Sequence, residues 1–234
     1  MKKLLIATSL VIVICALILS GGCRRIDLSG NATTKDFNDI TGFTRINVGS
    51  TFNANITRAD SFSVSVVINE KLVDRLKVVK NGDTLEVGFK SPTWGFWGFE
   101  GRPEVTITLP DLRGLELSGA SEGTVNGFKS SNDLKIQVSG ASTLTFDAQS
   151  GNFNADISGA SGVTGTLKAS ASHIVLSGAS HATLSGSGGD ATIDASGASH
   201  IDLSAYPVGN ADVTLSGASS GSIYASGKLN VDLS

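Results

Sequence analysis

The tetrapeptide Ser-Gly-Ala-Ser occurs six times in the chain, and this repeat constrains the fold more than any other feature. The copies begin at residues 118, 139, 158, 177, 196 and 216, so successive copies are 21, 19, 19, 19 and 20 residues apart. A nearly fixed period of this length is typical of a solenoid, in which each unit buries its apolar face against its neighbours. The repeat therefore predicts a stack of similar coils.

Residues on both sides of the tetrapeptide alternate in polarity. The positions one and three residues before it are apolar in every copy, as in Leu115 and Leu117, and the position between them is polar in all copies but one. After it come an apolar column and a hydroxyl column, which are Leu144, Val163, Ala182 and Ile201, and Thr124, Thr145, Thr164 and Thr183. A period of two predicts short strands with one buried face. Because parallel crossovers are almost always right-handed, we expect an all-β, right-handed parallel β-helix.

The tetrapeptide itself predicts a tight corner between two strands. Its glycine supplies a positive φ at little steric cost, which assigns a structural turn role to Gly119, Gly140, Gly159, Gly178, Gly197 and Gly217. We expect the following alanine to point inward, where a narrow corner has room only for a methyl group. The flanking serines are expected to bond to the turn backbone.

The first 23 residues predict export and anchoring. Met1, Lys2 and Lys3 form a basic start, an apolar run covers residues 4–19, and small residues precede Cys23. This pattern predicts a signal peptide over residues 1–22 and a lipidated Cys23, and residues 23–36 are then a lipid anchor and tether. Ordinary cleavage and release is the alternative. The only other cysteine is Cys15, inside the apolar run, so the mature chain has no pair for a disulfide.

Residues 37–112 lack the tetrapeptide but are rich in alternating segments. Asn69 is expected to cap a short helical segment that ends near Leu76, and Asn81-Gly82 predicts a hairpin. We expect irregular coils or a β cap packed on the first regular coil, forming one domain with coils over residues 113–234. At the other end, Val231-Asp-Leu-Ser234 starts a seventh repeat, which leaves a strand edge for end-to-end self-association or a short strand that blunts this edge.

Three sequence features together resemble a known bacterial family. They are Phe43-Thr-Arg-Ile-Asn-Val48, the segment Val105-Thr-Ile-Thr-Leu-Pro-Asp-Leu112, and the repeated Leu-Ser-Gly-Ala-Ser. The chain from about residue 40 to 234 resembles the head GIN domain family, also called putative auto-transporter adhesin. The resemblance implies a cell-envelope protein, often a lipoprotein, with a β-helix similar to that of pectin lyases but without their catalytic residues.

An aromatic segment is the main candidate for a contact surface. Residues 91–99 contain both tryptophans of the chain, interleaved with glycine, and the four aromatic residues are Trp94, Phe96, Trp97 and Phe99. Aromatic side chains provide large contact areas at low entropic cost, so this segment could stack on sugar rings or insert into a partner. The alternative is that these residues fold over an open end of the core.

The histidines and acidic residues give weaker signals. His181 and His200 each follow a tetrapeptide and are expected to stack in adjacent coils, with Asp202 as the nearest third ligand, but two imidazoles make a poor metal site. Glu116, Asp156, Asp194 and Asp232 skip one coil each time, which spaces like charges apart. Only Thr143-Leu-Thr145 is expected to carry threonine at both outward positions, which disfavours an ice-binding face.

The sequence as a whole predicts a non-enzymatic binding module of the cell envelope, with no cofactor and no metal. No set of nucleophile, base and orienting residue is evident. Without Lys2 and Lys3 the chain has 16 basic and 21 acidic residues, which disfavours nucleic acid as a partner. A polysaccharide or a cell-surface protein is the expected partner, with the membrane reached through the lipid anchor. A polysaccharide-active enzyme and an envelope scaffold are the alternatives.

Overall fold

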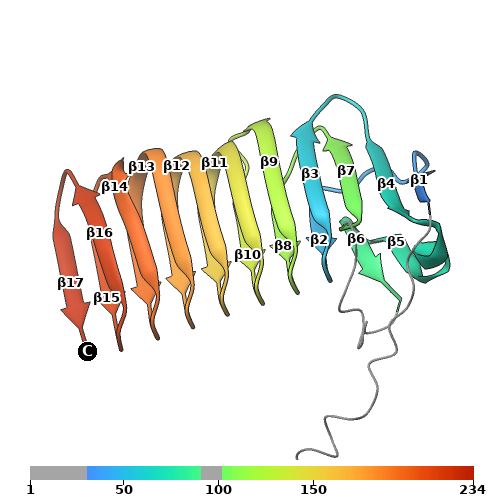
Figure 1. Ribbon diagram of the computed structural model, residues 1–234. Coiled ribbons are helices and arrows are strands. Elements are labelled where there is room, and N and C mark those ends of the chain that lie inside the picture. The colour runs from blue at the N-terminus through green and yellow to red at the C-terminus, as the bar shows by residue number, and fades with distance from the viewer. Residues whose placement is uncertain (1–30, 91–101) are drawn as a thin grey trace, which may run out of the picture.

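Most strands of the protein form a parallel β-solenoid of about six turns, as the sequence predicts. The computed structural model describes residues 31–90 and 102–234. In Figure 1 the coils succeed one another along the axis, with the C-terminal coil at one end and the N-terminal elements at the other. Within these described ranges, no helix is long and apolar enough to cross a bilayer.

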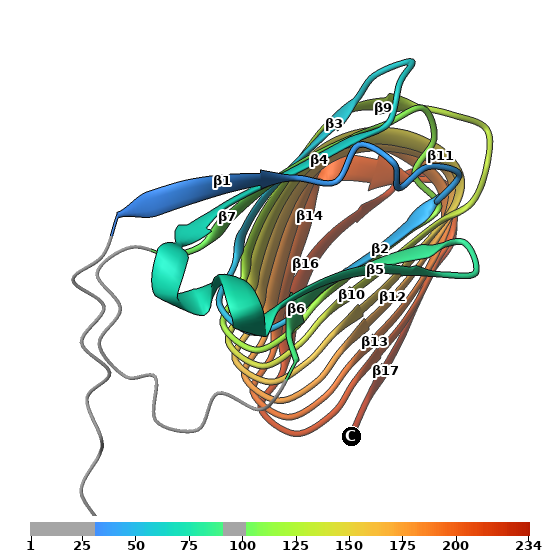
Figure 2. The same cartoon turned by 90° about the vertical axis from the view of Figure 1, so that its right-hand side faces the viewer.

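The regular coils have two long faces on opposite sides of the core, and successive coils nearly superimpose when the solenoid is viewed along its axis (Figure 2). Their strands are β8 (Gly114–Leu117), β9 (Glu122–Lys129), β10 (Leu134–Val138), β11 (Thr143–Ile157), β12 (Gly162–Leu176), β13 (His181–Ala195), β14 (His200–Val208), β15 (Ala211–Leu215), β16 (Ser220–Ala225) and β17 (Leu229–Leu233). The three longest strands continue around the corner that lies opposite the tetrapeptides, so each contributes to both faces.

Equivalent residues of successive coils lie side by side in register. Thr145 pairs with Thr124 and Thr164, and Thr164 pairs with Thr183. The expected apolar column from Leu144 to Ile201 is buried, with each member at most 1% exposed. Alternation in the sequence therefore becomes an apolar core inside the coil and polar rows outside it, which confirms the predicted period of two.

The Ser-Gly-Ala-Ser corner differs from the prediction in one respect. Its alanine points outward, since five of the six copies are exposed and Ala120 is half-buried, whereas the last serine of the first five copies is almost fully buried. Positive φ at the glycine reverses the direction of the chain, so the alternation is shifted by one residue. In Ser121, Ser180 and Ser199 the buried hydroxyl donates to the carbonyl of the first serine of the motif, as in the 2.9 Å bond from Ser121 Oγ to Ser118 O, whereas Ser161 Oγ has no hydrogen-bond partner among the described residues.

The N-terminal part combines coils with an antiparallel cap. Its elements are β1 (Ala32–Asp36), β2 (Arg45–Val48), β3 (Asn53–Arg58), β4 (Ser63–Asn69), the 3-10 helix η1 (Glu70–Arg75), β5 (Leu76–Asn81), β6 (Thr84–Phe89) and β7 (Glu104–Leu109). Asn69 caps η1 by accepting a bond from the Lys71 amide, and β5 and β6 form the expected hairpin. Residues 32–36, which the sequence assigns to the tether, instead form β1 and pair with β4.

The first coil is inserted between two others that follow it in the chain. Strand β2 pairs in parallel with both β6 and β8, and β3 pairs in parallel with both β7 and β9. The chain therefore leaves this coil, forms the antiparallel strands β4 and β5 at the end of the solenoid, and returns through β6 and β7. Figure 1 shows β3 between β7 and β9. This arrangement closes the N-terminal end of the core.

The inserted coil also has a corner that lacks the tetrapeptide. Ser50 has φ +76° and occupies the position of the motif glycine, since its carbonyl accepts the Ala120 amide just as Gly119 O accepts the Ala141 amide. Gly49, Thr51 and Phe52 occupy the other three motif positions. The solenoid therefore has a further corner that the Ser-Gly-Ala-Ser repeat does not reveal.

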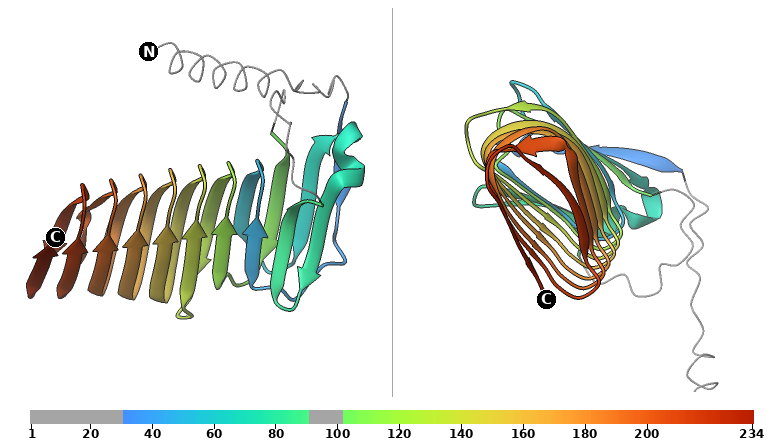
Figure 3. Two further views of the ribbon diagram at one scale, coloured as in Figure 1. Left: turned by 90° about the horizontal axis from the view of Figure 1, so that it is seen from below. Right: turned by 90° about the vertical axis from the view of Figure 1, so that its left-hand side faces the viewer.

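The last described coil exposes apolar side chains at the edge of the sheet. Tyr224 is 56% exposed, Leu229 47%, Val231 51% and Leu233 69%. Figure 3 shows this end of the solenoid, which has no antiparallel strands like those of the opposite end. Because β17 pairs only with β15 among the described strands, the predicted edge is present.

Candidate binding face

One long face of the solenoid carries an ordered array of hydroxyl and amide groups. We call it the hydroxyl face, formed by the outward residues of β7, β3, β9, β14, β16 and the first parts of β11, β12 and β13. One outward row crosses the paired strands in the order Thr106, Asn55, Thr124, Thr145, Thr164, Thr183, Asp202 and Ser222. Because paired strands are ~4.8 Å apart, this row presents one polar side chain at each such step.

A second pair of outward threonines is present that the sequence does not suggest. Thr164 and Thr166 are both exposed on β12, although only Thr143 and Thr145 were expected to form such a pair. Thr166 Oγ1 lies 3.1 Å from Ser185 Oγ in the next coil. Gly165 hides the pattern in the sequence because it occupies the buried position between the two threonines.

A polar pocket lies at the N-terminal end of the hydroxyl face. It has a volume of about 280 Å³ and lies across β7, β3 and β9. Its lining residues are Asn53, Ala54, Asn55, Glu104, Val105, Thr106, Glu122 and Thr124. In the strand register Asn53 lies between Glu104 and Glu122, and Asn55 lies between Thr106 and Thr124. The pocket thus has two parallel rows of three polar side chains each.

Two features define the chemistry of this pocket. The Oδ1 atom of Asn53 is buried and has no hydrogen-bond partner among the described residues. The carboxylate of Glu122 lies 3.5 Å from the guanidinium of Arg102, while Glu104 is exposed. The site therefore combines an unsatisfied acceptor with two acidic groups, only one of which has a cation beside it in the described ranges.

The opposite long face, which we call the acidic face, carries the predicted alternation of acids. Glu116, Asp156 and Asp194 are separated in the register by Gln137 and Val175. The structure extends this row to Asn47 and Glu86, and Asn47 Nδ2 donates to Glu116 Oε2 at 2.9 Å. Lys77 bonds to Glu86 and lowers the pKa of its carboxyl group. Neutral residues therefore separate the carboxylates along the row.

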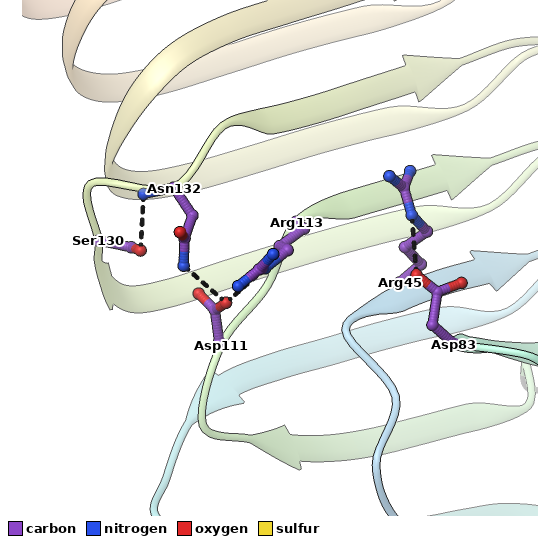
Figure 4. Close-up of polar contacts among 6 residues, drawn as sticks. All are labelled: Arg45, Asp83, Asp111, Arg113, Ser130 and Asn132. Carbon is purple, nitrogen blue, oxygen red and sulfur yellow. Dashed lines mark hydrogen bonds and ion pairs between the residues drawn. The ribbon is translucent and has the colours of Figure 1, made fainter.

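Polar contacts also join neighbouring coils near the edges of the acidic face. Asp111 Oδ2 accepts hydrogen bonds from Arg113 Nε and Asn132 Nδ2, each at 2.9 Å, and Asn132 N is 3.0 Å from Ser130 Oγ (Figure 4). Arg45 pairs with Asp83 at 3.2 Å in the same view. These groups are already mutually satisfied, so they have a clear structural role.

The two histidines lie side by side in the register, as predicted, but their rings have separate environments. The His181 ring lies against Gly162 of the preceding coil, where an added Cβ would be 2.4 Å from the ring. His200 Nδ1 instead lies 2.9 Å from Ser220 Oγ of the following coil. Within the described ranges there is no group of three or more histidine, cysteine or acidic side chains able to hold a metal ion.

His200 also has a serine partner that sequence reasoning missed, because Ser220 is 20 residues away. The nearby Asp202 accepts a 2.9 Å bond from the Ser204 amide, and the pKa of Asp202 is lowered chiefly by Ser204 and to a smaller extent by His200. A serine, a histidine and an aspartate thus lie on neighbouring strands, but the hydrogen bond of Asp202 is directed to Ser204.

Two predicted sites fall outside the described residues. These are the lipidation site Cys23, with the signal peptide before it, and the aromatic segment with Trp94, Phe96, Trp97 and Phe99. The segment joins β6 to β7 in the chain, and the described residues after it are Arg102, which contacts Glu122, and Pro103, whose carbonyl accepts the Asn53 amide.

Solved structures of bacterial proteins share this fold. A "putative lipid binding protein" from Parabacteroides distasonis aligns with a TM-score of 0.74 at 17% identity, covering 89% of this chain and 99% of that one. A "putative adhesin" from the same species has a TM-score of 0.68 at 15% identity, covering 87% and 98%. A "putative adhesin" from Bacteroides fragilis has a TM-score of 0.60 at 19% identity, covering 89% and 100%.

No curated protein matches the chain. A family model does, and its match begins at residue 42 and continues to residue 234, so that it includes the inserted coil, the polar pocket and all six tetrapeptides. The chain therefore belongs to the family described as "putative auto-transporter adhesin, head GIN domain".

Proposed function

We propose that this protein is a non-catalytic adhesive module of the bacterial cell envelope and that the hydroxyl face is its contact surface. The observation that carries this proposal is the register of the outward row from Thr106 to Thr183, which aligns polar groups over six successive strands. Such an array is held rigidly by the backbone ladder, so little conformational entropy is lost on binding. Membership in a family named for adhesins supports the same function.

The anchor and the aromatic segment complete the proposal. Acylation of Cys23 after removal of residues 1–22 would attach the solenoid to a membrane, with residues 24–31 between the lipid and β1. Trp94, Phe96, Trp97 and Phe99 would add an apolar contact to the polar face. Support for both comes from the sequence pattern alone.

Opposite faces of the same two strands allow a controlled test of the contact surface. Bacteria displaying the full chain would be measured for retention on immobilised bacterial and host polysaccharides. Thr145→Arg with Thr164→Arg places two bulky cations on the hydroxyl face, and Asn154→Arg with His173→Arg places the same cations on the acidic face of β11 and β12. We expect the first pair to reduce retention at least tenfold and the second pair to leave it unchanged.

Other outcomes would contradict specific parts of the proposal. Equal effects of the two pairs would show that the hydroxyl face is not the contact surface. Release of new chain ends from a polysaccharide would support the alternative of a polysaccharide-active enzyme. A Cys23→Ser variant that stays in the membrane fraction would contradict the lipid anchor. A Trp94→Ala, Trp97→Ala variant that is fully retained on the polysaccharides would show that the aromatic segment does not contribute to the contact.

A further inference from the structure

The polar pocket at the end of the hydroxyl face has the chemistry of a sugar-binding site. Its two rows contain two carboxylates, two amides and two hydroxyls, from Glu104, Glu122, Asn53, Asn55, Thr106 and Thr124. Ionised carboxylates only accept hydrogen bonds, whereas amides and hydroxyls both donate and accept. A polyhydroxylated ligand matches this mixture because each of its hydroxyl groups can donate to a carboxylate and accept from an amide.

Asn53 supplies the observation that most directly indicates a missing partner. Its Oδ1 atom is buried between the strands without a hydrogen bond from any described residue. A buried polar atom in this state costs roughly 1–3 kcal/mol, and such atoms in native proteins call for an explanation. Oδ1 has almost no accessible surface, so a ligand hydroxyl that donates to it after a rotation of the Asn53 side chain toward the pocket would remove this cost. Ligand binding would therefore supply the hydrogen bond that Asn53 Oδ1 lacks among the described residues.

The charge and polarity of the lining residues indicate which class of ligand the pocket can bind. Two carboxylates beside Asn53 repel phosphate, sulfate and uronate groups, and within the described ranges Arg102 forms an ion pair with only one of them, Glu122. A divalent cation is also disfavoured, since the described residues offer no group of three strong ligands. Among the described residues that line the pocket, only Ala54 and Val105 are apolar, and neither has a large side chain. These observations disfavour an anion, a divalent cation and a large apolar ligand, and they favour an uncharged polyhydroxylated ligand.

The size of the pocket limits how much of such a ligand it holds. A volume of about 280 Å³ is near the lower end of the range of roughly 300–1,000 Å³ for small-molecule pockets. Thr124 is both a lining residue of the pocket and a member of the outward row that continues through Thr145 and Thr164. A chain that starts in the pocket can therefore continue along the hydroxyl face.

We propose that this pocket binds one sugar ring of a neutral glycan, with the adjoining rings lying along the hydroxyl face. This inference rests on the proposed adhesive function and specifies its ligand. Glu104 and Asn53 accept from ring hydroxyls, Asn55 and Thr106 bond to the same ring from the neighbouring row, and Thr124 begins the path for the next ring.

Binding of defined hexasaccharides to the full chain in detergent tests the proposal. The neutral probes are maltohexaose, cellohexaose, laminarihexaose and mannohexaose, and the anionic probes are a galacturonate hexamer and a heparin hexasaccharide. We expect measurable calorimetric binding of at least one neutral probe and none of the anionic probes. Asn55→Ala and Thr106→Ala alter exposed side chains, so the fold is retained, and each is expected to weaken binding about tenfold.

The control is Asn154→Ala, which removes an outward asparagine from the acidic face and should not change the affinity. Absence of binding to every neutral probe, preferential binding of an anionic probe, or equal affinity of the Asn55→Ala and wild-type chains would overturn the sugar-site proposal. If the sugar-site proposal fails but retention in the display assay still depends on Thr145 and Thr164, the adhesive function remains supported. If retention does not depend on these two threonines, the adhesive function is contradicted, whatever the calorimetric result for the pocket.

Discussion

The hydroxyl of Tyr206 lies 3.0 Å from that of Ser172 inside the core, which joins β14 to β12 across the intervening coil. Tyr206 is fully buried, and this burial raises the pKa of its phenol. Space for the ring comes from Gly188 of β13, where an added Cβ would lie 2.6 Å from the phenolic oxygen. A buried polar pair of this kind makes the packing of three coils interdependent.

The losses of stability from removing the Tyr206 and Ser172 hydroxyls should not be additive. Tyr206→Phe leaves the Ser172 hydroxyl without this partner, and Ser172→Ala leaves the Tyr206 hydroxyl without it, so each should cost about 1–3 kcal/mol. In the double variant no hydroxyl is left buried alone, and the loss should be clearly smaller than the sum of the two. Urea unfolding of the four proteins measures this coupling. Strictly additive losses would contradict it.

The motif glycines should resist substitution for two separable reasons. Gly159 has φ +74°, and an added Cβ would lie 2.5 Å from Gly140 O, whereas Gly82 has φ +61° and nothing within 4 Å of such a Cβ. Gly82→Ala should therefore cost only the left-handed backbone penalty of about 1–2 kcal/mol. Gly159→Ala adds a clash with the backbone of the preceding coil.

We expect Gly159→Ala to lose at least twice as much stability as Gly82→Ala in thermal or urea unfolding. The clash cannot be relieved by a rotamer change, because Gly140 O also accepts the hydrogen bond of the Ala160 amide. Similar losses in the two variants would show that the coils can move apart at the corner.

Much of the solenoid follows from local patterns. The repeat predicts the coils, the alternation predicts the Thr124–Thr183 row and the acidic row, and the Asn69 cap and the hairpin at Gly82 follow from short-range chemistry. The inward direction of the last motif serine was missed because positive φ at the preceding glycine changes the alternation in a way that polarity does not reveal.

Non-local pairing accounts for the remaining differences. No local pattern states that β3 lies between β7 and β9, so the meeting of Asn53 with Glu104 and Glu122 in one pocket was not predictable. Gly165 hides a second threonine pair because the Phe146 ring fills the space that its side chain would occupy, at 2.3 Å from an added Cβ. A large side chain in one coil is thus matched by a small residue in the neighbouring coil, and this exchange interrupts the alternation of apolar and polar residues within a coil.

Ser50 gives an opportunity to stabilise the inserted coil. It is the only non-glycine residue with positive φ among those described, at +76°, and it occupies the position that glycine holds in the tetrapeptide. Ser50→Gly removes the left-handed penalty of about 1–2 kcal/mol but adds unfolded-state entropy of roughly 0.5–1 kcal/mol. We expect a net gain of about 0.5–1 kcal/mol in urea unfolding. A loss of stability would indicate that the Ser50 side chain makes a compensating contact.

Asp190 should make stability depend on pH in the acid range. Its Oδ1 accepts bonds from Asn210 N at 2.8 Å and Asn210 Nδ2 at 3.1 Å, and the backbone bond is the main cause of its lowered pKa. A folded pKa below the unfolded value of about 3.9 means that the contribution is fully present above that pH. It is lost as the pH falls through the folded value.

Asp190→Asn keeps an acceptor but removes the charge, so it should lower the Tm at pH 7, because a charged acceptor makes the stronger hydrogen bond. The difference from wild type should shrink as the pH falls below about 3.9, since the wild-type carboxyl group then becomes neutral too. Asn210→Ala retains the backbone donor and should preserve most of this pH dependence. A Tm difference that stays constant from pH 7 to pH 2 would show that the charge of Asp190 does not stabilise these coils.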